Sequence, residues 1–268
     1  MNRWRMVLII LIFGAILASI VLAAVLFQSS WKSVVEKLYS VELSPRKVAF
    51  IHLGYSGVIL RTMNFTIGID VANLLSEKDI QNIGKMDLLV YTHIHGDHFN
   101  AAIAQEIYEK TGCFIAAEQA VYNALSNVVP DGKLVRLQGG ESREIYLQTG
   151  KIVLRSIYGV HPVQIILFMV EADGIRVFHG GDSGYSQSIK DLGHADIAFL
   201  PTGDPSPTAS PEGAVKMALD LSPKVIVLFH GSSAQHNSFI DEARSSLTAE
   251  VIQAETGKVY VKDISPQS

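Results

Sequence analysis

A run of six residues, His93-Ile94-His95-Gly96-Asp97-His98, constrains this chain more than any other part of its sequence. It contains three imidazoles and one carboxylate. In an extended segment the side chains of His93 and His95 point to the same side, because side chains alternate with a period of two. Gly96 permits a sharp turn, after which Asp97 and His98 begin a new element. The run therefore predicts four polar side chains that converge on one concave spot.

The sequence on either side of the run indicates how it is held. The apolar segment 87–92 predicts a buried strand that leads directly into the histidines, and 100–110 has the spacing of a helix. Imidazole and carboxylate groups are ligands that suit zinc, iron or manganese. One such run rarely completes the coordination of two metal ions. Further ligands are therefore expected at distant strand ends on the same edge.

Three further side chains of this kind stand at the borders of predicted strands. His161 precedes the apolar segment 164–171, Asp182 follows the strand 174–178, and His230 follows the strand 224–229. The glycines around Asp182 let the backbone approach a ligand closely. Together with the first run, these residues predict a metal site assembled from several strand ends.

The rest of the chain predicts strands in a meander, mixed with helices, after residue 46. Strands are predicted at 48–53, 58–62, 65–70, 87–92, 113–117, 134–137, 144–147, 151–158, 164–171, 174–178, 195–200 and 224–229. Helices are predicted at 100–110, 211–221 and 237–247. This order indicates an α/β (α+β) domain over 46–268, with helices covering packed sheets.

The N-terminus carries an uncharged apolar run of 21 residues, Val7 to Phe27. At about 1.5 Å per residue, a helix of this length spans a hydrocarbon core of about 30 Å. The alternative is a cleaved signal peptide, whose apolar region is usually only about 7–15 residues long. We therefore predict a membrane anchor in 1–28, as one transmembrane helix, and a linker in 29–45.

The charges beside this run predict its orientation. Arg3 and Arg5 precede it, whereas Lys32 and Lys37, partly offset by Glu36, follow it. The positive-inside rule then places the N-terminus in the cytoplasm. The expected protein is single-pass, with an extracytoplasmic catalytic domain.

Charge and cysteine content exclude other classes of protein. The formal net charge of −4 gives no sign of a nucleic-acid-binding surface. The chain has a single cysteine, Cys113, so it forms no internal disulfide and no cysteine-rich zinc site. A small molecule is the expected substrate, and the oligomeric state is left open.

The combined spacing resembles that of the metallo-β-lactamase superfamily. The motif His-x-His-x-Asp-His is followed by a lone His, then Gly-Asp-Ser-Gly, then a strand-end His. Within that superfamily the chain looks like the lactonase-like branch that includes L-ascorbate-6-phosphate lactonase. Three features carry this finer resemblance: Asp70 after its strand, the segment 195–203, and Leu221-Ser-Pro-Lys before the last metal-bearing strand.

The resemblance implies a four-layer αββα sandwich with a binuclear site at one edge of the two sheets. His93, His95 and His161 would hold one metal. Asp97, His98 and His230 would hold the second, and Asp182 would bridge both. Zinc is expected, with manganese as the alternative.

A hydrolytic mechanism follows from such a pair of ions. Two cations a few Å apart lower the pKa of a bridging water, which falls to about 7 on a catalytic zinc. The hydroxide attacks an ester, lactone or phosphoester, and Asp97 orients it and shuttles its proton. Asp70 has two interpretations, an acceptor that fixes the tautomer of a ligand imidazole or a cap of its strand-end turn.

The substrate is less well determined than the metal ligands. The lactonase-like branch often has Gly-His-Ser in the first turn, where this chain has Gly54-Tyr55-Ser56. Tyr55 and His236 are the candidate substrate contacts, whereas the remaining histidines are interpreted as packing or surface residues. The alternatives are a phosphodiesterase, nuclease or lipid phosphodiesterase with the same metals, and a non-catalytic metal-binding member.

Overall fold

The computed structural model describes residues 33–72 and 74–265, whose strands form two sheets of seven strands each. The first sheet has the order β14 (Val259–Asp263), β1 (Lys47–Gly54), β2 (Gly57–Arg61), β3 (Thr66–Ile69), β4 (Leu88–Tyr91), β5 (Phe114–Ala117) and β6 (Leu134–Arg136). The second has the order β13 (Glu250–Gln253), β12 (Val225–Phe229), β11 (Ile197–Pro201), β10 (Ile175–His179), β9 (Ile166–Ala172), β8 (Gly150–Tyr158) and β7 (Ser142–Leu147).

The inner faces of the two sheets pack against each other. Phe50 of β1 and Phe199 of β11 meet edge to face, with ring centroids 5.2 Å apart. Both belong to one buried apolar cluster, to which Ile67 of β3 and Phe168 of β9 also contribute. Burial of each such side chain stabilises the fold by about 1.5–3 kcal/mol.

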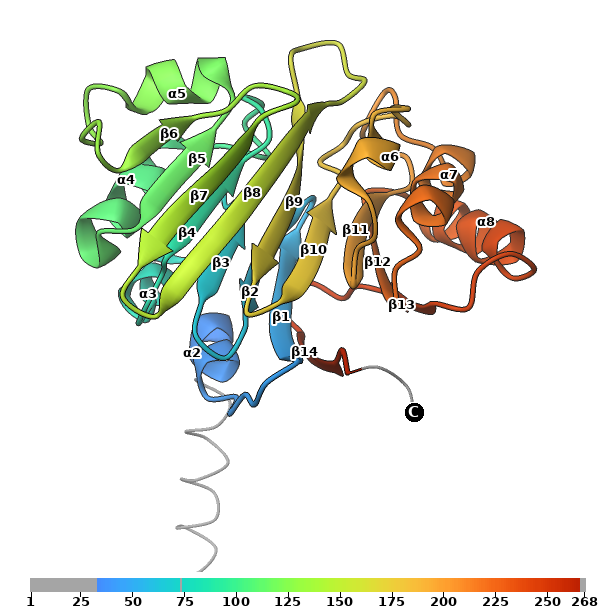
Figure 1. Ribbon diagram of the computed structural model, residues 1–268, viewed down its shortest axis with the longest axis horizontal. Coiled ribbons are helices and arrows are strands. Elements are labelled where there is room, and N and C mark those ends of the chain that lie inside the picture. Colours follow the sequence, from blue (N-terminus) through green and yellow to red (C-terminus); the bar gives the residue numbers. More distant parts are fainter. Residues whose placement is uncertain (1–32, 73, 266–268) are drawn as a thin grey trace, which may run out of the picture.

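Helices cover the two outer faces (Figure 1). The outer face of the first sheet is covered by α2 (Val34–Tyr39), α3 (Glu77–Gln81), α4 (Ala101–Thr111) and α5 (Gln119–Leu125). The outer face of the second sheet is covered by α6 (Ile189–Leu192), α7 (Pro211–Leu221) and α8 (Ser233–Ala243). The predicted αββα sandwich is therefore confirmed.

The direction of the strands brings several loops to one edge of the sandwich. Strands β3 to β6 are parallel, and so are β10 to β13. Strand β8 runs in the same direction as β10, because both are antiparallel to β9 between them. The segments that follow β3, β4, β8, β10 and β12 leave the carboxyl ends of their strands, where the chemistry-bearing residues were predicted.

Some predicted elements differ from those observed. The last helix, expected at 237–247, is α8 and begins four residues earlier, at Ser233. Strands β13 and β14 and the short helices α3, α5 and α6 were not predicted. Helix α2 lies within the predicted linker, where Val35 and Leu38 are fully buried against the first sheet's helical layer.

The predicted membrane placement requires a correction. In residues 33–72 and 74–265, no helix is both long enough and apolar enough to cross a bilayer. The apolar run 7–27, on which the transmembrane helix and the orientation rested, lies outside the described residues. The predicted single-pass membrane protein with an extracytoplasmic domain is therefore not supported by the described residues.

Candidate metal centre

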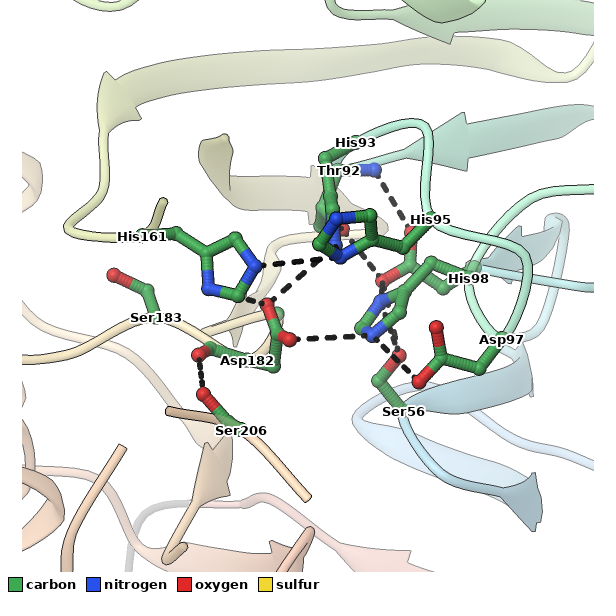
Figure 2. A network of polar contacts seen from close by, with 12 residues as sticks. Ser56, Thr92, His93, His95, Asp97, His98, His161, Asp182, Ser183 and Ser206 are labelled. Atoms are coloured by element: carbon green, nitrogen blue, oxygen red, sulfur yellow. Dashed lines mark hydrogen bonds and ion pairs between the residues drawn. The ribbon is translucent and has the colours of Figure 1, made fainter. Parts of the chain in front are cut away.

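Four predicted ligands meet at the edge of the sandwich, as Figure 2 shows. One nitrogen or oxygen from each of His93, His95, His161 and Asp182 lies within 4.8 Å of the others. Nδ1 of His95 is 3.0 Å from Nε2 of His93 and 3.3 Å from Nε2 of His161. His93 and His95 follow β4, whereas His161 follows β8 in the other sheet.

A second group lies beside the first. Asp97, His98 and His230 each offer one ligand atom within 4.8 Å of the other two. Oδ2 of Asp97 is 3.7 Å from Nε2 of His98. The rings of His98 and His230 are stacked, with centroids 5.4 Å apart. His230 directly follows β12, so this group too joins the two sheets.

Asp182 stands between the two groups. Its Oδ1 is 3.7 Å from Nε2 of His93 and 3.5 Å from Nδ1 of His161. Its Oδ2 is 3.7 Å from Nε2 of His98. One carboxylate oxygen therefore faces each group, the arrangement that a shared ligand needs.

The donor atoms fit a divalent metal. Buried side-chain atoms without a hydrogen-bond partner include Nε2 of His98, Nδ1 of His161, Oδ1 of Asp182, and both ring nitrogens of His230. Buried polar atoms in proteins nearly always have partners, so such a concentration needs an explanation. A cation supplies it for the Asp182 oxygen and for one nitrogen of each imidazole, because these atoms have a lone pair to donate, whereas the other nitrogen of His230 carries the proton.

Burial keeps most of these histidines ready to bind a metal. It lowers the pKa of His93 to about 2, of His230 to about 3 and of His161 to about 4. They are therefore neutral at pH 7, the form that ligates metals. Burial also raises the pKa of Asp182 to about 6, which reflects the cost of a buried carboxylate without a cation.

Asp70 lies outside the two ligand groups and orients two of the ligand histidines. Its Oδ2 lies 2.8 Å from Nδ1 of His98 and accepts a hydrogen bond from Thr92 Oγ1 at 2.7 Å. Its Oδ1 accepts from the Thr92 amide at 2.8 Å, and Thr92 Oγ1 lies 3.0 Å from Nδ1 of His93. Asp70 thus contacts one ligand directly and reaches another through Thr92.

The charge of Asp70 is maintained in this fully buried position. Burial alone would raise its pKa, but the His98 hydrogen bond and nearby imidazoles hold the pKa well below its usual range. For His98, burial acts to lower the pKa, but the Asp70 hydrogen bond and the charges of Asp70, Asp182 and Asp97 together outweigh it and raise the pKa. With Nδ1 directed at Asp70, Nε2 of His98 is left facing the cluster. These contacts correspond to the tautomer-fixing interpretation of Asp70.

Comparisons with known proteins identify the family of this chain. Residues 50–230 match the model of a family described as a beta-lactamase superfamily domain. A UPF0173 metal-dependent hydrolase of Thermus thermophilus is 30% identical over 188 residues, which cover 67% of this chain and 81% of the relative. The chain belongs to the metallo-β-lactamase superfamily. Its assignment to the lactonase-like branch stays a prediction.

Solved structures of the metallo-β-lactamase fold are similar over most of the domain. The metallo hydrolase Igni18 of Ignicoccus hospitalis is 23% identical, with a TM-score of 0.68 over 81% of this chain and 98% of that one. The metallo-beta-lactamase fold protein YhfI of Bacillus subtilis is 15% identical, with a TM-score of 0.63 over 81% of this chain and 100% of that one. At these identities the likeness concerns the fold alone.

Several residues of this metallo-β-lactamase site were not predicted. Ser56 Oγ donates a hydrogen bond to Oδ2 of Asp70 at 3.1 Å, and Ser206 Oγ donates to the backbone carbonyl of Asp182. His179, interpreted as a packing or surface residue, is fully buried and lies 2.9 Å from the Ser56 carbonyl. Its Nδ1 accepts from the Gly181 amide. Ser56 belongs to the Gly54-Tyr55-Ser56 turn, but the contacts of all three residues with the site arise only in the tertiary fold.

The two candidate substrate contacts lie on the side of His230. The ring of Tyr55 is 6.0 Å from that of His230, and Tyr55 is 49% exposed. His236 lies on α8, and its ring lies close to Gly231, the residue after His230. Its Nε2 is buried without a hydrogen-bond partner. Both residues therefore flank the second metal-ligand group.

Proposed function

We propose that this protein is a hydrolase that uses two divalent cations, zinc by default and manganese as the alternative. His93, His95 and His161 would hold one cation, and Asp97, His98 and His230 the other. The observation that carries the proposal is the position of Asp182, which directs one oxygen at each group of ligands. Relatives named metal-dependent hydrolases support the reaction class.

The two cations would supply a Lewis acid and a water of lowered pKa. The chain supplies orientation and proton transfer. The Asp97 side chain is 32% exposed, so its carboxylate reaches the solvent side of the cluster. There it can orient an incoming water and accept its proton. Asp70 and Thr92 hold His98 and His93 in the geometry that this arrangement needs.

The substrate in this proposal is a small molecule with an ester, lactone or phosphoester bond. The loops that carry the candidate ligands contain no lysine or arginine, over residues 92–100, 159–165, 180–188 and 230–232, and neither do the neighbouring segments 54–57 and 202–210. Proteins that hold nucleic acid neutralise its phosphates with these side chains. The nuclease alternative is therefore the weaker one.

Metal analysis combined with a substrate panel tests the proposal. We expect about two metal ions per purified chain, and hydrolysis of at least one ester, lactone or phosphodiester. Asp182→Asn should lose bound metal and reduce hydrolysis by more than the roughly 10–100-fold that loss of an outer hydrogen-bond partner costs. His194→Ala, a change at an exposed histidine outside the site, is the control and should have no effect.

Two results would contradict the proposal. One is a purified chain that holds less than one metal ion and cannot be reloaded. The other is a fully loaded chain that hydrolyses nothing in the panel, which would favour the non-catalytic alternative. Full activity of Asp182→Asn would contradict the assignment of Asp182 as a ligand shared by the two cations.

A further inference from the structure

Tyr55 adopts a backbone conformation that tyrosine rarely takes. Its φ of 46° lies in the left-handed region, where Cβ crowds the backbone of every residue except glycine. Outliers of this kind persist only when their surroundings hold them, and they concentrate at functional sites. Two residues of the candidate metal centre, Asp70 and His230, share this feature, with φ of 49° and 42°.

Hydrogen bonds fix the turn on both sides of Tyr55. Its carbonyl accepts from Nε2 of His52 at 2.8 Å. The next carbonyl, of Ser56, accepts from Nε2 of the fully buried His179 at 2.9 Å. The Ser56 hydroxyl donates to Asp70, which also holds His98. The strained turn is thus tied to the framework of the metal centre.

These bonds hold the backbone and leave the side chain exposed. The ring of Tyr55 lies 6.0 Å from that of His230, yet the residue is 49% exposed. In the described part of the chain, the phenol has no hydrogen-bond partner. An exposed phenol therefore lies beside the second ligand group, and the described residues give its hydroxyl no acceptor.

The charges around the site indicate what this donor would bind. None of the loops that carry the candidate ligands contains lysine or arginine, and Lys258, in the loop that pairs with His52 beside the Tyr55 turn, forms an ion pair with Glu255. A phosphate bound here would be held by the metal ions alone, without the charge-assisted hydrogen bonds that Lys and Arg usually add. A carbonyl oxygen, in contrast, is neutral in the substrate and gains negative charge only during hydrolysis, when a preorganised neutral donor stabilises it most.

We propose that Tyr55 is a catalytic residue that donates a hydrogen bond to the carbonyl oxygen of a neutral carboxylic ester or lactone. This inference rests on the proposed function and selects one substrate class within it. Water adds to the carbonyl carbon and the acyl C–O bond breaks, so an ester gives an acid and an alcohol, and a lactone gives one hydroxy acid. The phenol keeps its proton throughout.

The test compares Tyr55→Phe with the wild type, both metal-loaded and full-length. The probes are δ-valerolactone, p-nitrophenyl acetate and bis(p-nitrophenyl) phosphate. We expect Tyr55→Phe to lower kcat for the first two by about 100-fold, the usual effect of removing one oxyanion donor. KM, metal content and Tm should stay close to those of the wild type. Tyr55→His restores a donor and should recover part of the kcat.

The control is Tyr146→Phe. Tyr146 is also exposed, but it lies on β7 opposite Lys151, at the far end of the sheet, and its hydroxyl contacts Glu144. Its loss should leave kcat unchanged.

The failures of the two proposals can be told apart. Equal kcat for Tyr55→Phe and the wild type on the ester and the lactone would overturn the role of Tyr55 alone. Cleavage of the phosphodiester only would overturn the substrate class, while the hydrolase proposal stands. A loaded protein that cleaves none of the three probes, nor any other member of the panel, would overturn both.

Discussion

Asp70 shows how one residue outside the ligand set can determine the geometry of a metal site. Its carboxylate contacts His98 directly and reaches His93 through the Thr92 hydroxyl. It also accepts from Ser56 in the turn that carries Tyr55. These bonds cross from β3 to β4 and to the first hairpin of the same sheet. Loss of the charge at this position would therefore disturb several elements of the site together.

We predict that Asp70→Asn weakens metal binding by about 10–100-fold, the cost of losing an outer-shell partner of a ligand histidine. The amide keeps the size of the side chain but removes the charge that holds the His98 tautomer. Competition with a fluorescent chelator measures the affinity. Asp87→Asn is the control, since Asp87 is also a buried carboxylate of the first sheet, yet bonds the Thr66 amide away from the ligands. Equal metal affinities for the two variants would exclude the orienting role.

At this scale, residue type and position predicted most of the site. Each of the seven predicted ligands stands in a segment that follows a strand end, and the structure brings them together in two groups. The roles of Ser56 and Thr92 could not be predicted from the sequence. A serine or threonine hydroxyl can bond many groups, and only the fold shows that these two contact Asp70. The packing interpretation of His179 is confirmed by its full burial against Phe199 and Phe229. Its hydrogen bonds could not be predicted, because the two partners, Ser56 and Gly181, belong to different sheets.

At the scale of elements, burial decided which strands could be predicted. Strands β4, β11 and β12 are buried along their whole length and show as continuous apolar runs. Strands β13 and β14 are edge strands with mostly exposed or half-buried residues, so no apolar run or alternation marks them. The pairing of β14 with β1 joins the two ends of the described chain, which no local pattern specifies.

Helix α8 had a start signal that the apolar spacing alone did not reveal. Ser232 and Gln235 form a capping box, in which each side chain bonds the backbone amide of the other. The box begins two residues after His230, and Gln235 also accepts from the Asp204 amide in the loop after β11. The cap therefore links the helix to two loops at the edge that carries the site.

We predict that Ser232→Ala destabilises the protein by about 1 kcal/mol, the usual cost of losing a helix N-cap. Urea denaturation measures the free energy of unfolding. Ser233→Ala is the matched control, because Ser233 is exposed at the first helical position and caps nothing, so its change should cost less than about 0.5 kcal/mol. Equal losses in the two variants would show that the capping box does not stabilise α8.

At the scale of the whole molecule, the candidate metal centre is a connection between the two sheets. His93, His95, Asp97 and His98 follow β4 of the first sheet, whereas His161, Asp182 and His230 come from loops of the second. The apolar core joins the inner faces of the sheets along their length, and the ligands join them again at one edge. A cation that binds only this assembled arrangement stabilises the folded state by mass action.

Metal removal should therefore lower the thermal stability of the entire domain. With free metal at about 100 times its Kd, linkage contributes about 2.7 kcal/mol, and a domain of this size loses about 2–4 °C in Tm per kcal/mol. We expect the Tm measured by calorimetry to fall by about 5–10 °C in chelator and to recover when zinc is restored. His93→Ala should begin near the metal-free Tm and respond little to chelator or zinc, because one ligand group is incomplete. If the wild type keeps its Tm in chelator while its bound metal is lost, the ligands do not connect the sheets energetically, and the core alone determines stability.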